Sequence, residues 1–125
     1  MNSRRLLAAA TALALTCGCG DYQTHDEREA TQFIQALSAG NLAAVRGDIA
    51  PSVHVSQAQV EAIQEKFRDQ GRLLYVHGYS VDCPDTWECF HVGFERRYYL
   101  LVVSYDKSRK INAWWIYPLK SSPQP

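Results

Sequence analysis

The apolar residues between positions 24 and 71 recur at intervals of three and four, the spacing of helices that bury one face. A residue able to cap a helix precedes each apolar stripe, and a glycine follows it. Two of these starts fit a capping box, in which Glu or Gln lies three residues after Ser or Thr. The pattern predicts helices from Thr24 to Gly40, from Asn41 to about Gly47 and from Ser56 to Gly71.

Strand-like sequence follows Gly71. Residues 73–81 are rich in aromatic and β-branched side chains, residues 90–97 alternate, and residues 98–105 are apolar on both faces. A polar turn at 106–110, expected to be solvated, leads to a last strand at 111–117 that the next proline closes. Helices followed by an antiparallel meander predict an α+β fold, with the N-terminal helices packed on one face of a four-stranded sheet.

The first residues have the pattern of a secretory leader. Two arginines precede an apolar run at residues 6–15, which is too short to span a bilayer because a spanning helix needs about 20 residues. Residues 15–20 read LTCGCG and resemble the lipobox of bacterial lipoproteins, in which the leader is cut just before a cysteine that carries a diacylglycerol. Cys19 is the predicted lipidation site because a small glycine precedes it, and Cys17 is the alternative.

This resemblance implies a signal peptide at residues 1–18 and a tether at 19–24. The pattern of helices and strands predicts one α+β domain at 25–118 and a flexible tail at 119–125. Two other interpretations fit less well. A signal-peptidase site at residues 12–14 would leave a short apolar region, and an uncleaved anchor would need a longer one.

A multiply acylated cysteine would anchor the protein firmly to a membrane, facing the periplasm of a bacterial cell envelope. In enterobacterial lipoproteins, Asp after the lipidated cysteine retains the protein at the inner membrane. Gly20 occupies that position here, so the outer membrane is expected.

Charge and motifs exclude several classes of function. The chain has 13 basic and 13 acidic residues and no long run of like charge. Nucleic acid binding normally needs a basic patch, so no nucleic acid partner is expected. The familiar catalytic and phosphate-binding motifs are missing from the sequence, and no catalytic residue, cofactor or metal is assigned.

Cys83 and Cys89 flank a short polar segment that contains a proline. In an exported protein, such a pair indicates a disulfide, which would stabilise the domain by about 2.4 kcal/mol on the chain-entropy model. A zinc site that adds His77 and His91 is conceivable, but its spacing matches none of the familiar zinc patterns.

The order of the elements resembles the nuclear-transport-factor-2-like superfamily, a cystatin-like α+β roll found in many small bacterial lipoproteins. Residues 30–41, the second capped helix and the strands that end in residues 113–116 carry the resemblance, which would cover about residues 25–118. This superfamily hosts enzymes, ligand binders and interaction modules, so the resemblance implies a fold and leaves the function open.

Aromatic residues are frequent in the predicted sheet. Adjacent residues of a strand point to opposite faces, so one member of each of the pairs Tyr98–Tyr99 and Trp114–Trp115 can fill the core. The other member would lie on the face that the helices leave open, where contiguous aromatic surface favours a protein partner or self-association. The candidate partner-binding residues are Trp87, Glu88, Tyr98, Tyr99, Trp114 and Trp115.

His77, His91 and Glu95 are candidate polar residues for a pocket between helices and sheet. Pairing Asp82 with Phe90 would place His77 opposite Glu95, where the two could form a proton-donating pair or an inconsequential surface pair.

Two functions follow from these features. The first is a membrane-anchored, non-catalytic module that binds a protein, with an immunity protein against a periplasm-acting toxin as its specific form. The alternative is a small-ligand-binding protein or enzyme with a pocket between helices and sheet.

Overall fold

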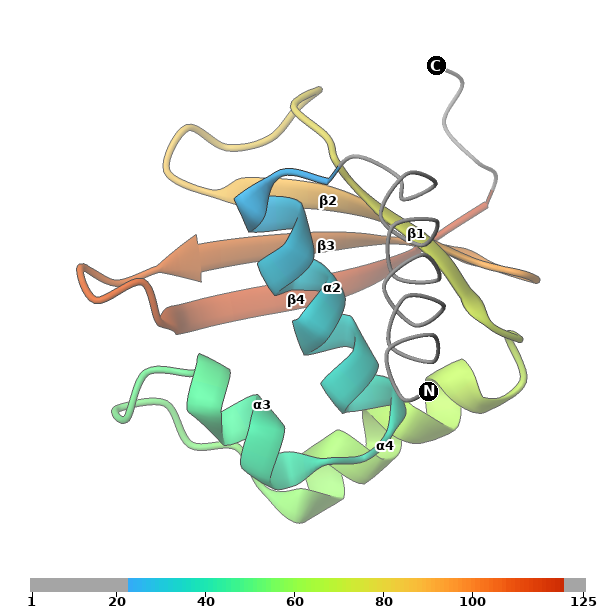
Figure 1. Ribbon diagram of the computed structural model, residues 1–125, viewed down its shortest axis with the longest axis horizontal. Helices are drawn as coiled ribbons and strands as arrows, with labels where there is room; N and C mark the ends of the chain where they lie inside the picture. Colours follow the sequence, from blue (N-terminus) through green and yellow to red (C-terminus); the bar gives the residue numbers. More distant parts are fainter. Residues whose placement is uncertain (1–22, 121–125) are drawn as a thin grey trace, which may run out of the picture.

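The computed structural model describes residues 23–120 as helices followed by a four-stranded antiparallel sheet (Figure 1). The helices are α2 (His25–Ser38), α3 (Leu42–Asp48) and α4 (Gln57–Arg68). The strands pair in chain order and are β1 (Leu73–Gly78), β2 (Glu88–Phe94), β3 (Tyr98–Tyr105) and β4 (Ile111–Leu119). The predicted α+β meander is therefore confirmed.

The predicted signal peptide and both candidate lipidation cysteines lie outside the described residues. The same holds for the tether up to residue 22 and for the tail from residue 121.

The starts of α2 and α4 depend on the predicted capping boxes. Thr24 Oγ1 accepts a hydrogen bond from the Glu27 amide at 3.1 Å, and Glu27 Oε1 accepts one from the Thr24 amide at 3.0 Å. Ser56 and Gln59 make the equivalent pair of bonds at α4. Since the first N–H groups of a helix have no partner within it, each box satisfies two backbone donors.

Glu27 also joins α2 to the sheet. Its Oε2 accepts a hydrogen bond from the Gly78 amide at 2.6 Å, which fixes the first turn of α2 against the end of β1. This bond, with those from Thr24, holds the pKa of the Glu27 carboxyl below its usual value.

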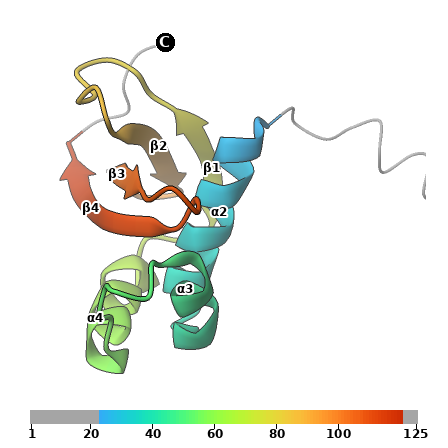
Figure 2. The same ribbon diagram turned by 90° about the vertical axis from the view of Figure 1, so that its left-hand side faces the viewer.

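One core lies between the helices and a single face of the sheet. Figures 1 and 2 show α2, α3 and α4 on the same side of the curved sheet. The apolar stripes predicted for the helices meet alternate residues of the strands there, as expected for amphipathic elements. The large side chains that are completely buried are Phe33, Ile34, Leu37, Val45, Val60, Val76, Val92, Leu101 and Val103.

The first hairpin differs from its predicted register. β1 ends at Gly78 rather than Val81, and the chain forms a turn at Val81 and Asp82, where Asp82 adopts a left-handed φ of 57°. Phe90 consequently lies opposite Gly78 instead of Asp82, and His77 lies opposite His91 instead of the predicted Glu95.

The loop between β1 and β2 is closed by a disulfide between Cys83 and Cys89, whose Cα atoms lie 5.9 Å apart. The predicted disulfide is therefore confirmed, and its formation excludes these cysteines as zinc ligands.

The last strand continues beyond its predicted end. β4 includes Pro118 and ends at Leu119, with Pro118 opposite Tyr99. A proline is tolerated there because β4 is the edge strand of the described sheet, so one side of its backbone bonds to no other described strand.

Candidate binding face

The sheet has a second face that α2, α3 and α4 do not cover, here called the helix-free face. Strand side chains alternate between faces, so the neighbours of the buried Val76, Val92, Leu101 and Val103 point toward it. Trp87, from the disulfide-closed loop, joins them through its contact with Trp115. The larger side chains of this face are Tyr75, His77, His91, Tyr98, Leu100, Val102, Trp115 and Tyr117.

A tryptophan pair lies at one end of the helix-free face. The ring centroids of Trp87 and Trp115 are 4.9 Å apart, and their planes meet at 46°. Trp115 is 48% exposed, and Tyr117 on the same strand is also 48% exposed. The Trp87 amide donates to the Pro84 carbonyl at 2.9 Å within the disulfide loop, which positions the indole beside the sheet.

His91 lies in the middle of β2 among tyrosine rings. Its ring centroid is 5.3 Å from that of Tyr75 and 5.7 Å from that of Tyr98, and the side chain is almost fully buried. Its Nε2 is buried without a hydrogen-bond partner among the described residues. Burial, together with the nearby charge of His77, lowers the pKa of His91, so the imidazole is neutral at neutral pH.

The Tyr75 ring reaches its position over His91 because β2 has a glycine there. Gly93 lies opposite Tyr75, and a Cβ added to it would overlap the tyrosine ring. An aromatic ring that covers a glycine on the next strand restores the packing that a missing side chain loses. Tyr75 also stacks on His77, with centroids 4.6 Å apart, so this end of the face is a continuous layer of rings.

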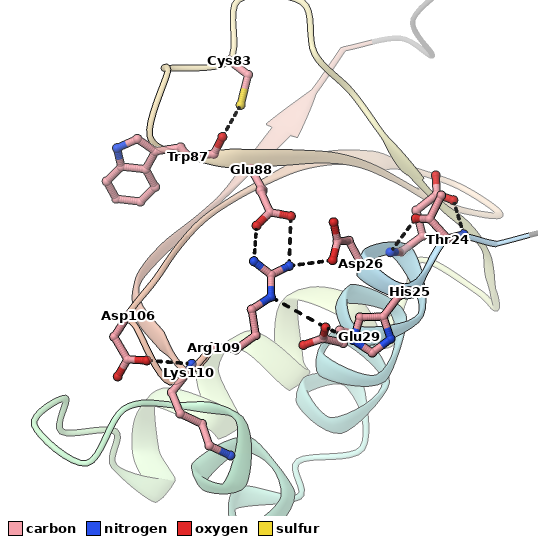
Figure 3. A network of polar contacts seen from close by, with 11 residues as sticks. Thr24, His25, Asp26, Glu29, Cys83, Trp87, Glu88, Asp106, Arg109 and Lys110 are labelled. Atoms are coloured by element: carbon pink, nitrogen blue, oxygen red, sulfur yellow. Dashed lines mark hydrogen bonds and ion pairs between the residues drawn. The ribbon is translucent and has the colours of Figure 1, made fainter.

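On the helix side, a cluster of charges surrounds Arg109 (Figure 3). Its guanidinium donates to Glu88 Oε2 at 2.7 Å and to Asp26 Oδ1 at 2.6 Å, and it lies 3.8 Å from Glu29 Oε1. The guanidinium carbon is 3.9 Å from the centroid of the Tyr105 ring. These partners come from α2, β2 and β3, so Arg109 connects the hairpin tip to the rest of the domain.

The Arg109 cluster corrects one sequence interpretation, in which residues 106–110 were a solvated turn. The turn is present, but Arg109 adopts a left-handed φ of 63° and its side chain lies against the body of the domain. Bonding to Glu88 raises the pKa of Arg109, and burial raises the pKa of the Tyr105 hydroxyl. The contacts are long-range in sequence, so no local pattern could indicate them.

The structure divides the candidate partner-binding residues between the two faces. Trp87, Tyr98 and Trp115 belong to the helix-free face. Tyr98 and Trp115 are the members of the two aromatic pairs that were expected on the open face. Tyr99 and Trp114 point toward the helices, where Tyr99 contacts Phe67 and Trp114 packs edge-on against Phe33. Glu88 also points that way and binds Arg109. Tyr99, Trp114 and Glu88 therefore cannot contribute to the helix-free face.

The candidate pocket residues do not lie between helices and sheet. His77 and His91 belong to the helix-free face, and Phe33, Phe67 and Leu101 fill the space between the helices and the inner face. Glu95 lies in the turn after β2 and accepts a hydrogen bond from the Arg72 amide at 2.6 Å, which lowers the pKa of the exposed carboxyl. The assignment of these three residues to such a pocket is wrong.

Within residues 23–120, no three His, Cys, Asp or Glu side chains converge in a way that could hold a metal ion. None of the helices described is long and apolar enough to cross a membrane. Comparison with protein-family models, curated proteins and solved structures gives no match for this chain.

Replacing Arg109 tests the energetic role of the cluster. R109A is expected to lower the free energy of unfolding by about 1–2 kcal/mol, since it removes partly exposed ion pairs and a cation–π contact. R109K keeps the charge without the bidentate geometry and should fall between R109A and wild type. Urea unfolding at low salt and at 1 M NaCl measures the effect, which should shrink in salt.

K107A, on the same turn, is the matched control and should change stability by less than about 0.5 kcal/mol. Equal effects of R109A and K107A, or an R109A effect that is insensitive to salt, would contradict this role.

The neutral, buried His91 predicts a pH dependence of stability. In the unfolded chain its pKa is about 6.5, and in the folded domain it is lower, so the unfolded chain takes up a proton first as the pH falls. Stability should therefore decrease from about pH 6.5 down through the folded-state pKa of His91. H91L removes this proton uptake, and urea unfolding between pH 7.5 and 5 should show a flatter profile.

H54L is the control, because it removes an exposed histidine from a loop, and the flattening of the profile should be specific to H91L. If the free energy of unfolding of H91L depends on pH as steeply as that of wild type, groups other than His91 determine the pH dependence.

Proposed function

We propose that this domain is a non-catalytic protein-binding module, held at the periplasmic side of a bacterial envelope membrane by a lipid on Cys19. The helix-free face contacts the partner. The observation that carries the proposal is the tryptophan pair Trp87 and Trp115, which with Tyr117 forms an exposed aromatic surface on the uncovered side of the sheet.

The charge distribution supports this proposal. The positions of the four strands that point to the helix-free face include aromatic, aliphatic, histidine and small residues, and no Asp, Glu, Lys or Arg. Centres of protein interfaces are depleted of charged residues and enriched in Tyr and Trp. The face thus has the composition of an interface centre, and some of its side chains are exposed in the domain alone.

The disulfide loop supports a rigid binding surface. Trp87 is held by the turn hydrogen bond to Pro84 and by the covalent closure of its loop, so little conformational freedom is lost when a partner covers the indole. Asp82 and Asp85, both exposed, add polar groups to the same loop as Trp87. A polar rim around an apolar centre is the usual organisation of an interface.

An immunity protein that blocks a periplasm-acting toxin is the specific form of this proposal. A small domain, an envelope anchor and a fixed loop with Trp87 suit a protein that must intercept an incoming protein at a membrane. The alternative in which His77, His91 and Glu95 form a pocket between helices and sheet is not proposed, because these three side chains do not lie there.

Site-specific photo-crosslinking in the native host tests the binding face. A photoreactive phenylalanine at position 115 or 117 of the full chain should give an adduct of defined mass, because these side chains are the most exposed aromatics of the face. The same residue at Glu61, exposed on α4, is the matched control. Mass spectrometry of the adduct separates a different protein from a second copy of this chain.

The absence of an adduct at both 115 and 117, or the same adduct at 61, would contradict a specific role for the helix-free face. An adduct with a second copy would mean that self-association covers the face.

Lipidation at Cys19 gives a second prediction. C19S should abolish incorporation of an alkyne-labelled fatty acid and release the protein from the membrane fraction, because one thiol carries the anchor. C17S should keep both label and membrane association. The opposite pattern would assign the lipid to Cys17, and labelling of both variants would exclude a single lipidated cysteine.

A further inference from the structure

A groove lies between α4 and the edge strand β4, on the helix side of the sheet. Its volume is about 470 Å³. On the helix, Ile63, Lys66 and Phe67 contribute to its wall, and Gln70 adds to it from the turn after α4. Lys66 and Phe67 follow Ile63 by three and four positions, so a single face of α4 borders the groove. On the sheet, the inward-pointing β4 residues Trp114, Ile116 and Pro118 form the opposite wall, and Trp115 contributes from the strand edge.

The wall of the groove is aromatic. Phe67 and Tyr99 lie together with ring centroids 5.1 Å apart, and Trp114 packs edge-on against Phe33 of the core. Those core contacts fix the rings that face the groove. A rigid aromatic wall and a volume within the range of about 300–1,000 Å³ are typical of sites for small molecules.

The charged groups of the groove are all positive. Among the residues that the structure describes, Lys66 and Arg97 line it, and no Asp or Glu does. Within residues 23–120 neither cation forms an ion pair, whereas Arg109, Arg72 and Arg68 do. Tyr99 adds a donor, since burial raises the pKa of its hydroxyl and keeps it protonated. An anionic group at this end of the groove would thus find cations and a hydroxyl.

An additional peptide strand fits the β4 edge poorly. At the start of β4, the Ala50 amide already donates to the Ile111 carbonyl at 2.8 Å, and Ile49 pairs with Ile111. Near the other end, Pro118 has no N–H to offer. Strand addition depends on a series of backbone hydrogen bonds, and the part of the β4 edge between Ile111 and Pro118 offers only a short series. The groove therefore suits a small ligand better than a peptide.

We infer that this groove binds a small amphipathic anion, with its apolar body on Phe67, Tyr99 and Trp114 and its head group between Lys66 and Arg97. A carboxylate with a short alkyl or aromatic body has this chemistry. The inference is independent of the proposed protein partner, because the groove lies on the opposite side of the sheet and shares only Trp115 with the helix-free face.

Matched ligands on the full chain test the inference. The chain is reconstituted in lipid nanodiscs, and binding of octanoate, octanol and octyltrimethylammonium is measured by titration calorimetry, with empty nanodiscs subtracted for partitioning. The three probes share a tail and differ in the charge of the head. Octanoate should bind most tightly, and the cationic probe should bind most weakly.

Removing the two cations tests the site itself. K66Q/R97Q should weaken octanoate binding by about tenfold or more and leave octanol binding unchanged, because charge-assisted bonds to the head are lost. R28Q/K107Q is the matched control, since Arg28 and Lys107 are also exposed and the loss of charge is equal. Thermal unfolding checks that both variants are folded.

The inference is overturned if octanoate does not bind, if octanol or the cationic probe binds as tightly, or if both double variants bind octanoate equally. None of these results affects the crosslinking at positions 115 and 117, so the two proposals fail separately.

Discussion

The packing of the helices against one face of the sheet determines most of the other features of this domain. The apolar stripe of α2, with Phe33, Ile34 and Leu37, is completely buried, and it meets strand residues that alternate between the two faces. Burial of a large apolar side chain contributes about 1.5–3 kcal/mol, so a strand that slipped by one residue would lose several such contributions at once. This constraint fixes which member of each aromatic pair points inward. Tyr99 and Trp114 lie under the helices, and Tyr98 and Trp115 must point to the helix-free face.

The two faces of the sheet also differ in the charged side chains that they carry. On the helix side, Arg109 gathers Asp26, Glu29 and Glu88, so acidic groups from α2 and β2 are compensated locally. On the helix-free face the four strands contribute no Asp, Glu, Lys or Arg, and the titratable groups in its centre are histidines and tyrosines. His91 is neutral there because the surrounding rings exclude water. Removing water from a surface of aromatic rings without Asp, Glu, Lys or Arg costs little free energy when a protein covers it, which is the physical basis of the proposed function.

Features that depend on local sequence could be predicted, and features that depend on long-range contacts could not. Capping boxes, glycine helix ends and side-chain alternation are set by neighbouring residues, so the helices, the order of the strands and the opposite orientation of Tyr98 and Tyr99 follow from the sequence. The disulfide could also be predicted from the sequence, because its two cysteines are close in the chain. The register of the first hairpin could not be predicted, since it depends on where the loop leaves the sheet. The chain turns at Asp82, and His77 lies opposite His91 and not opposite Glu95. Arg109 shows the same limit, because its partners come from segments far away in sequence.

The groove beside β4 follows from the same packing. Within residues 23–120, no strand lies beyond the edge strand β4, and α4 is the helix that covers the inward-pointing side chains at its end. Phe67 does this for Tyr99 and Phe94, but the helix ends at Arg68, and the remaining space is lined by Trp114, Ile116 and Pro118. Lys66 and Arg97, both exposed, line the same space. A cavity at the edge of a core is then apolar inside and positive at its mouth, which is the arrangement that an amphipathic anion requires.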